Sequence, residues 1–391
     1  MKFRLKELTV APVFMSFVGL VGFTLAFSTP VQCQSAAQQA AAATGKGLTA
    51  GEYFKNVTTS TLKGLTPSDF LGAMGVMTAA VGYDCSNCHP GAGTDAMDWV
   101  TDSNPKKVTA RKMVEMVATI NRQSFSGAQM VTCWTCHHGL DLPTTSIALD
   151  KLYGEPNDEK RDVVVAAEGE PPATQILDQY IQAMGGAQKL DAIKNYTASG
   201  HSEGYGGLGG NAAFEIFAES PNRHGMWIHF PQHPDRGISA WTFDGKTGWI
   251  SQPRGFMPKY ELTGNDLAGA RLDSMLAFPG QIKTALSNWR VGPEDSIRDR
   301  TVYVVQGSGP GGLLGTLYFD KETHLLLRYV RQTPSPVGRI SIQQDFDDYR
   351  EVNGIKFPFK YSFLWLDGRF TALISDVKLN VPVDAAKFAK P

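Results

Sequence analysis

The chain has 391 residues, which is long enough for two or three domains with separate cores, and its charges nearly balance at 37 basic and 38 acidic side chains. Because no basic stretch occurs, nucleic-acid binding is excluded from the expected functions. The sequence also lacks a Walker loop and a nucleophile–base motif, so neither nucleotide hydrolysis nor covalent hydrolase chemistry is indicated.

The chain begins with the pattern of an export signal. Three basic residues within the first six positions precede an apolar run at 8–27. The run approaches the roughly 20 residues that span a bilayer, so a cleaved signal peptide and a retained anchor both stay open. Cys33 follows, either as a lipidated cysteine or as an incidental thiol, but "TPVQ" lacks the small residue expected just before a lipidation site. We assign residues 1–33 to a signal peptide or membrane anchor and residues 34–52 to a low-complexity tether.

The next segment carries a doubled cysteine pattern. Cys-x-x-Cys-His occurs at 85–89 and again at 133–137, and it uses four of the five cysteines. On a helical turn, cysteines three apart share a face beside the following histidine, which suits two thioether bonds to one haem and an axial imidazole on its iron. A zinc site expects its two knuckles roughly 15–20 residues apart, a thioredoxin-like pair occurs once, and disulfides do not explain the histidines. We therefore predict two covalently bound haem c groups, held by Cys85, Cys88, His89, Cys133, Cys136 and His137.

A methionine-bearing helix is predicted before each motif. Thr66 is expected to begin a helix that carries Met74 and Met77, and a second helix carries Met113 and Met116. A helix laid along a haem could offer a thioether to the iron opposite the histidine. Methionine on an apolar helix face usually packs in the hydrophobic core, however. The residues alone leave both interpretations open and do not choose within either pair.

Residues 53–143, with "LTPSDFLGAMGVMTAAVGYDCSNCH" and "VTCWTCHHG" as the most specific parts, resemble the cytochrome c subunit of photosynthetic reaction centres. The resemblance implies an electron carrier, places the axial metal ligands on Met74 and Met113 beside His89 and His137, and leaves Met77 and Met116 as packing residues. The family usually has four haems, whereas two motifs are present here. The haem nearest the pigment pair has no counterpart, so the resemblance argues against direct reduction of a pigment. The expected partners are membrane-bound or periplasmic redox proteins, with a photosynthetic reaction centre as one candidate.

The chain changes character after the second motif. Residues 150–173 are rich in charge and proline and are expected to be a linker. Apolar residues at helical spacing then predict a helix that ends at Gly185-Gly186. The remainder alternates short β-rich runs with turn signals, which predicts an antiparallel sheet of many strands covered by that helix. The apolar helix positions are Ile176, Leu177, Tyr180, Ile181 and Met184, and the β-rich runs are 213–220, 225–230, 240–251, 301–308, 315–332, 356–366 and 370–380.

This C-terminal half resembles exported β-sheet proteins of the lipoprotein-carrier (LolA/LolB-like) type in "ILDQYIQAMGGAQKLDAIKNYTASG", "FDGKTGW" and "VKLNVPVDAAKF". The resemblance implies a curved sheet wrapped on a helix, with an apolar concavity for a lipid, another hydrophobic ligand or a partner surface. Five aromatic residues either line that concavity or belong to ordinary sheet core. They are Trp227, Trp241, Trp249, Phe363 and Trp365.

The expected fold is a mostly α dihaem cytochrome c domain over residues 53–149, followed by an α+β domain over 174–391 with a curved antiparallel sheet packed on a helix. We expect an exported, membrane-associated electron carrier at the periplasmic side of a bacterial cytoplasmic membrane. Two axial ligands on each iron would leave no open site, which argues against an enzyme. The alternative is a lipid or hydrophobic-ligand binding protein whose haem domain is a redox sensor or docking module.

Overall fold

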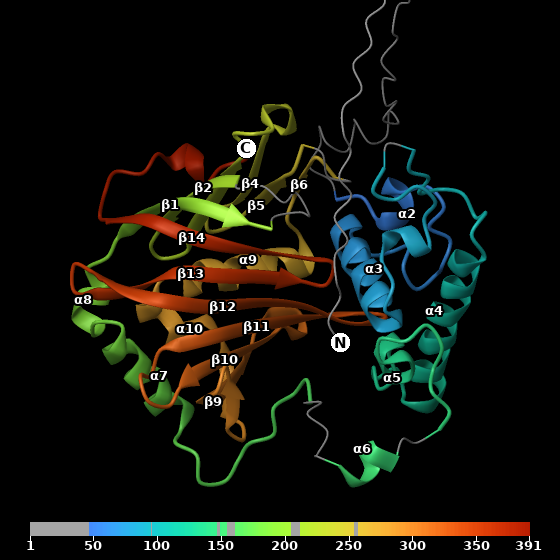
Figure 1. Cartoon of the computed structure of the whole chain (residues 1–391), viewed down its shortest axis with the longest axis horizontal. Helices are drawn as coiled ribbons and strands as arrows, with labels where there is room; N and C mark the ends of the chain where they lie inside the picture. The colour runs from blue at the N-terminus through green and yellow to red at the C-terminus, as the bar shows by residue number, and fades with distance from the viewer. Residues whose placement is uncertain (1–46, 95, 147–148, 155–160, 205–211, 254–256) are drawn as a thin grey trace, which may run out of the picture.

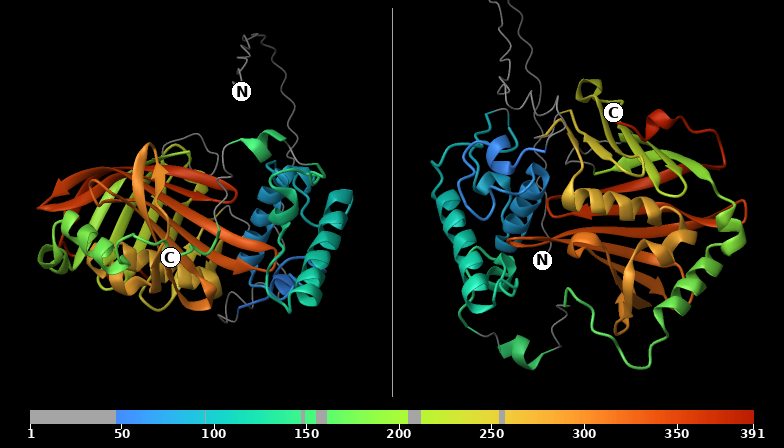
Figure 2. Two further views of the ribbon diagram at one scale, coloured as in Figure 1. Left: turned by 90° about the horizontal axis from the view of Figure 1, so that it is seen from below. Right: turned by 180° about the vertical axis from the view of Figure 1, so that it is seen from behind.

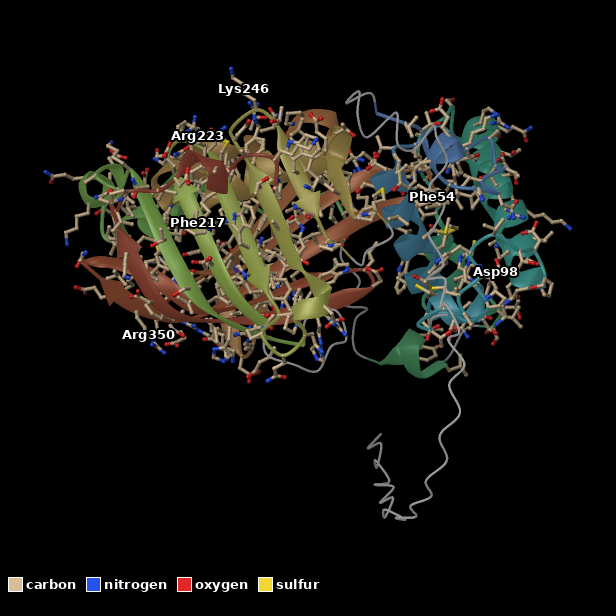
Figure 3. All side chains as sticks on the ribbon, turned by 90° about the horizontal axis from the view of Figure 1, so that it is seen from above. Phe54, Asp98, Phe217, Arg223, Lys246 and Arg350 are labelled. Carbon is tan, nitrogen blue, oxygen red and sulfur yellow. The ribbon has the colours of Figure 1, made fainter. Side chains whose placement is uncertain are left out.

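The computed structural model consists of a helical part before residue 155 and a sheet part after residue 160 (Figure 1). Seen from above, Phe54 and Asp98 lie in the helical part, whereas Phe217 and Arg350 lie in the sheet part (Figure 3). Cys33, the export run and most of the tether lie outside the described residues. No helix in the described part of the chain has the length and apolar character to cross a membrane. The described residues are 47–94, 96–146, 149–154, 161–204, 212–253 and 257–391.

The regular elements described in the helical part are helices. They are α2 (Ala50–Tyr53), α3 (Pro67–Val81), the 3-10 turn η1 (Cys85–Asn87), α4 (Pro105–Ser124), α5 (Cys133–His137) and α6 (Leu149–Tyr153). The predicted start of α3 is confirmed, because the Thr66 hydroxyl accepts a hydrogen bond from the Asp69 amide at 3.1 Å. The helix predicted before the second motif is also confirmed as α4, with Asn104 as its N-cap.

The buried face of α3 differs from the predicted methionine stripe. Ala73, Val76 and Ala80 are its buried apolar side chains, whereas Met74 and Met77 are only partly buried beside them. Small side chains let a helix approach its neighbours closely, so the small residues take the tightest contacts. The methionines are left at the edge of that contact.

The sheet part is one antiparallel sheet, whose main path runs β6-β5-β4-β3-β2-β1-β14-β13-β12-β11-β10-β9-β7, with β8 paired to β9. All seven predicted β-rich runs are confirmed as strands, whereas β1, β6, β7, β8 and β12 were not predicted. The strands are β1 (Asn195–Glu203), β2 (Ala212–Glu219), β3 (Arg223–His229), β4 (Ile238–Phe243), β5 (Gly248–Ser251), β6 (Lys259–Glu261), β7 (Ser287–Val291), β8 (Asp295–Ile297), β9 (Arg300–Ser308), β10 (Leu314–Asp320), β11 (Leu326–Ser335), β12 (Gly338–Val352), β13 (Ile355–Trp365) and β14 (Gly368–Leu379).

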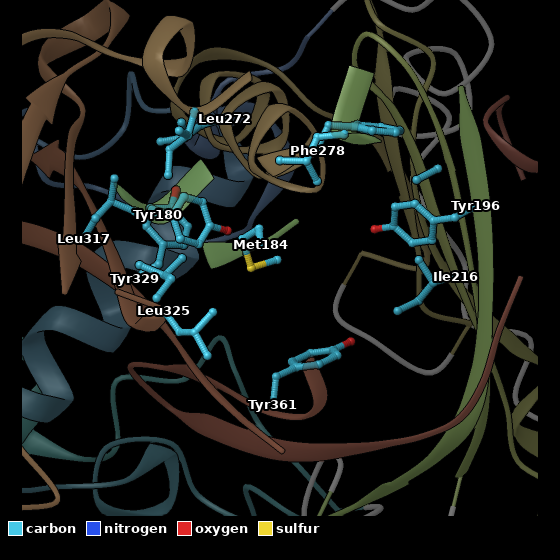
Figure 4. Close-up of a cluster of buried hydrophobic side chains, with 14 of the residues drawn as sticks. Tyr180, Met184, Tyr196, Ile216, Leu272, Phe278, Leu317, Leu325, Tyr329 and Tyr361 are labelled. Atoms are coloured by element: carbon cyan, nitrogen blue, oxygen red, sulfur yellow. The ribbon is translucent and has the colours of Figure 1, made fainter. Parts of the chain in front are cut away.

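Helices cover one face of the sheet and enclose the main core. The predicted helix is confirmed as α7 (Ala173–Ala183), and α8 (Ala187–Asp191), α9 (Gly264–Leu276) and α10 (Ile282–Ala285) join it. All five predicted apolar positions of the α7 segment are buried in this core. Figure 4 shows Tyr180 and Met184 on one side of the core and Tyr196 and Ile216 of the strands on the other. Short 3-10 turns lie at Pro234–Arg236, Pro279–Gln281, Pro310–Gly312 and Ala385–Lys387.

The five aromatic residues expected around one concavity lie on two faces of the sheet. Three pack against the main core. Trp227 and Trp249 lie on the opposite face beneath the C-terminal tail, where Trp227 Nε1 donates to the Lys387 carbonyl at 3.0 Å and the Lys390 ammonium lies 4.4 Å from the Trp249 ring centroid. Alternate strand positions face opposite sides, so these two residues neither belong to the main core nor share one lining with the other three. The three on the core face are Trp241, Phe363 and Trp365.

The second half of the expected linker is bonded to the sheet. The Gln306 side chain accepts a hydrogen bond from the Val164 amide at 3.0 Å and donates one to the Asp162 carbonyl at 2.8 Å. The Ala167 amide donates to the Val291 carbonyl at 3.0 Å. Residues 162–167 thus run along β9 and β7, while residues 155–160 lie outside the described residues.

The helical part packs against one end of the sheet. In Figure 1, the ends of β11 and β12 reach α3 and α5, and both views of Figure 2 show these strands meeting the helices. Helix α3 contacts β11, β12 and α9. The two parts are therefore joined by packing as well as by the chain.

Candidate haem sites

The second cysteine motif forms the short helix α5. Its N-cap Thr132 exchanges hydrogen bonds with Thr135, which fixes the first turn. Cys133 is buried and Cys136 is exposed. The His137 Nδ1 atom lies 2.9 Å from the Leu140 carbonyl oxygen. Because a carbonyl oxygen only accepts, Nδ1 carries the proton and Nε2 presents its lone pair, which is how metal-binding histidines are oriented.

The first motif forms the 3-10 turn η1. Asp84 caps the turn through the Ser86 amide at 2.8 Å, and the His89 amide closes it on the Cys85 carbonyl at 2.9 Å. Cys85 is exposed and Cys88 is partly buried. The turn therefore presents two thiols and an adjacent imidazole, as the motif requires.

The His89 ring is sheltered. Its centroid lies 4.9 Å from that of Trp99, and its buried Nδ1 has no hydrogen-bond partner among the described residues. Burial and then the nearby Lys107 ammonium lower the pKa of His89. Both effects favour the neutral imidazole, which is the form that binds metals.

The candidate methionine ligands lie on α3 and α4. Met74 and Met77 pack against a buried cluster that includes Cys133 of the second motif. Met113 is partly buried, whereas Met116 is 42% exposed. Val114 and Val117 occupy the buried face of α4, and the expectation that Met116 is a packing residue stays a prediction.

The surroundings of the second motif suit a porphyrin. Large apolar side chains that soluble proteins usually cover are exposed on and around α5. They are Met130 at 62%, Trp134 at 45%, Leu140 at 47% and Leu142 at 74%. Together with unpaired thiols and a correctly oriented imidazole, they provide the apolar contact, the attachment points and the ligand that a c-type haem needs. The residues present therefore fit this group.

The two cysteine pairs stay apart. In the part of the chain that the structure describes, no three or more His, Cys, Asp or Glu side chains form a group that could hold a metal ion. A single zinc site built from both pairs is not formed there. Burial raises the pKa of the Cys133 thiol to about 11, so this cysteine is not a reactive thiolate.

A family profile described as "Photosynthetic reaction centre cytochrome C subunit" matches residues 24–175. The resemblance is confirmed. Photosynthetic reaction center cytochrome c subunits from Thermochromatium tepidum and Rubrivivax gelatinosus are 29% identical over 162 residues and 34% identical over 114 residues. The matches cover 38% and 27% of this chain, and the chain spans 38% and 29% of the length of these relatives.

Solved structures match the sheet part. A DUF1329 family protein from Desulfovibrio piger has a TM-score of 0.39 and 14% identity, covering 56% of this chain and 98% of that chain. A LolA superfamily protein from Nitrosomonas europaea has a TM-score of 0.38 and 13% identity, covering 56% of this chain and 99% of that chain.

Proposed function

We propose that this chain is an exported, membrane-associated cytochrome that carries two covalently bound haem c groups and relays single electrons. The observation that carries the proposal is the geometry of the second motif. There, two thiols share one helical turn, and His137 is held through Nδ1 with Nε2 available for iron. The first motif repeats the residue pattern on its own short turn.

Each residue has a defined role in the proposal. The cysteines of each motif anchor one porphyrin, and His89 and His137 bind the irons. Met74 and Met113, on the helices before the motifs, would also hold the irons. Bound haem would supply reversible one-electron chemistry. With two ligands from the chain on each iron, the site would pass electrons and would not bind a substrate.

The proposed location is the periplasmic side of the bacterial cytoplasmic membrane. The basic and apolar residues at the start of the chain support export, and c-type attachment takes place outside the cytoplasm. The proposed partners are membrane-bound or periplasmic redox proteins, among them a photosynthetic reaction centre. Similarity to reaction-centre subunits over residues 24–175 supports a partner of this kind.

The test is haem stoichiometry in the purified full chain. We expect two haems per chain by pyridine haemochrome assay and a mass increase of two covalent haems. Cys133→Ala together with Cys136→Ala should leave one haem, because only the first motif remains. Cys33→Ala is the matched control and should leave two. One haem per wild-type chain, or haem that acid acetone extracts, would refute the proposal.

A further inference from the structure

Two hairpin turns of the sheet part meet the helical part. The β11–β12 turn consists of Pro336 and Val337, and the β13–β14 turn consists of Leu366 and Asp367. Because β11 to β14 are consecutive antiparallel neighbours, both turns lie at the same end of the sheet. The β11–β12 turn at this end meets α3 and the second cysteine motif.

The β11–β12 turn is bonded to the second motif. The Cys133 amide donates to the Val337 carbonyl at 3.2 Å, and the Gln129 side-chain amide donates to the Ser335 carbonyl. Val337 is 0% exposed and belongs to the same buried cluster as Cys133. Gly338 has a φ of +146°, and a Cβ there would lie 2.9 Å from a Val76 methyl group on α3. The turn therefore closes directly over the start of α5.

The β13–β14 turn contacts helix α3. A Cβ built on Gly75 of α3 would lie 3.0 Å from the Leu366 Cβ, so the helix backbone and the turn are in close contact. Helix α3 in turn packs on α5, which carries the second motif. The two turns therefore hold the same helix against the sheet.

Hydrogen bonds from one polar side chain link α3 to one of the strands that carry the turns. The Asn265 amide of α9 donates to Asp69 of α3 at 3.2 Å and to the Pro334 carbonyl of β11 at 3.0 Å. One side chain therefore ties together both parts of the chain. Directional bonds of this kind specify one arrangement where apolar packing alone would allow several.

We propose that the β11–β12 turn closes the second haem site, so that the sheet part sets the potential of that haem. The inference rests on the proposed function, which supplies the haem. Val337 adds an apolar wall at the second site and disfavours the extra charge of ferric iron, which raises that potential.

The test is a redox titration of sheet-part variants of the full-length holoprotein. Val337→Asp should lower the potential of one haem and leave the other nearly unchanged, because it replaces the apolar wall with a carboxylate. Val337→Ala shortens the wall without adding a charge, so it should lower the same potential by a smaller amount. Ile238→Asp, at a residue of β4 that is 46% exposed, is the control for a new carboxylate and should move neither potential.

Hydrogen exchange gives a second readout that does not depend on electron transfer. Val337→Asp should speed exchange of the Cys133 amide at least about tenfold, because a carboxylate in the buried cluster displaces the turn whose Val337 carbonyl accepts this amide's hydrogen bond. Ile238→Asp should leave that amide protected. Val337→Ala adds no charge, so this variant folds even where Val337→Asp does not.

The outcomes separate the two proposals. Two haems in the wild type with both potentials unmoved by both Val337 variants overturn this inference and leave the proposed function standing. Fewer than two haems in the wild type overturn the proposed function itself. A lowered potential of one haem, with a silent control, supports the docking of the β11–β12 turn on one site.

Discussion

The four methionines of α3 and α4 share one sequence pattern but differ in their surroundings. Met116 is 42% exposed, whereas Met113, three residues earlier, is partly buried. We expect Met113→His to lower the potential of one haem by a fraction of the ~0.8 V that axial ligands span, because a thioether favours ferrous iron more than imidazole does. Met116→Leu should leave both potentials in place and change the unfolding free energy by less than about 0.5 kcal/mol.

A two-step redox titration followed at the near-infrared band of methionine-ligated ferric haem distinguishes these residues. Met74→His should shift the haem that Met113→His leaves unchanged. Helix α3, which carries Met74, packs against α5 of the second motif. A shift of the same haem by both variants would therefore contradict the assignment of Met74 and Met113 to different haems. Loss of the band in Met116→Leu alone would move the ligand to Met116.

Asp266 of α9 is a second residue whose environment makes a prediction. Burial raises its pKa, while the Ser68 hydroxyl and Arg331 of β11 lower it and Asp69 of α3 raises it further. Tyr260 of β6 also faces this carboxylate. A raised folded-state pKa means that the contribution of Asp266 to stability is fully present below its unfolded pKa of about 3.9 and is lost as the pH rises through the folded value.

We therefore expect the ionisation of Asp266 to lower the unfolding free energy of the wild type as the pH rises from about 4 towards neutral. Asp266→Asn keeps the shape and the hydrogen bond to Ser68 but does not ionise, so its unfolding free energy should fall less over this range. Denaturant unfolding at a series of pH values measures both. Equal pH slopes for the two proteins would show that Asp266 does not resist ionisation.

At the scale of elements, α3 uses glycine to approach the sheet. A Cβ on Gly72 would lie 2.6 Å from the Ile340 Cδ1 of β12. Gly72→Val should gain a few tenths of a kcal/mol in helix propensity but lose about 1–3 kcal/mol by overpacking, so packing wins and the unfolding midpoint falls. Gly64→Val is the matched control, because nothing lies within 4 Å of its Cβ position. Equal stability of the two variants would show that α3 does not press on β12.

Local signals in the sequence are sufficient to predict several elements. Thr66 marks α3, helical spacing marks α7, and alternation marks seven β-rich runs, because caps and periodicity depend on near neighbours. Strand β12 was missed because its polar residues mask the alternation. Asp345 is tolerated there because Arg328 of β11 pairs with it at 2.6 Å. Helix α9 was not predicted, and its Gly269, a weak helix former, makes room for the Arg331 guanidinium.

The candidate sites likewise combine residues that local patterns predict with contacts that local patterns do not predict. The cysteines and histidines follow from a pattern of five residues, so the sequence predicts them. The contact of Val337 with Cys133 joins positions about two hundred residues apart, and nothing in one sequence connects them. Gly72 and Gly75 look like weak helix positions until the sheet part is placed against them. The docking of the two parts is thus the feature that sequence patterns leave out.

At the scale of the whole molecule, the buried contacts make the two parts a docked pair. The cluster that includes Cys133 and Val337 takes side chains from both parts, and Asn265 bonds to both. A haem domain on a free linker would keep its properties after separation. A docked haem domain depends on the sheet part. Cleavage of the chain between the two parts therefore does not by itself separate them.

Limited proteolysis tests this distinction. Tyr153 of α6 is 83% exposed, so chymotrypsin should cut there, before the residues that Gln306 holds on the sheet. Because the parts share a buried interface, the two fragments should elute together in native buffer and keep the haem spectrum of the intact chain. The fragments of Val337→Asp should separate on the same column, since the new carboxylate lies in the interface. If the wild-type haem fragment elutes alone with an unchanged spectrum, the two parts are independent, and the sheet part has no influence on the haems.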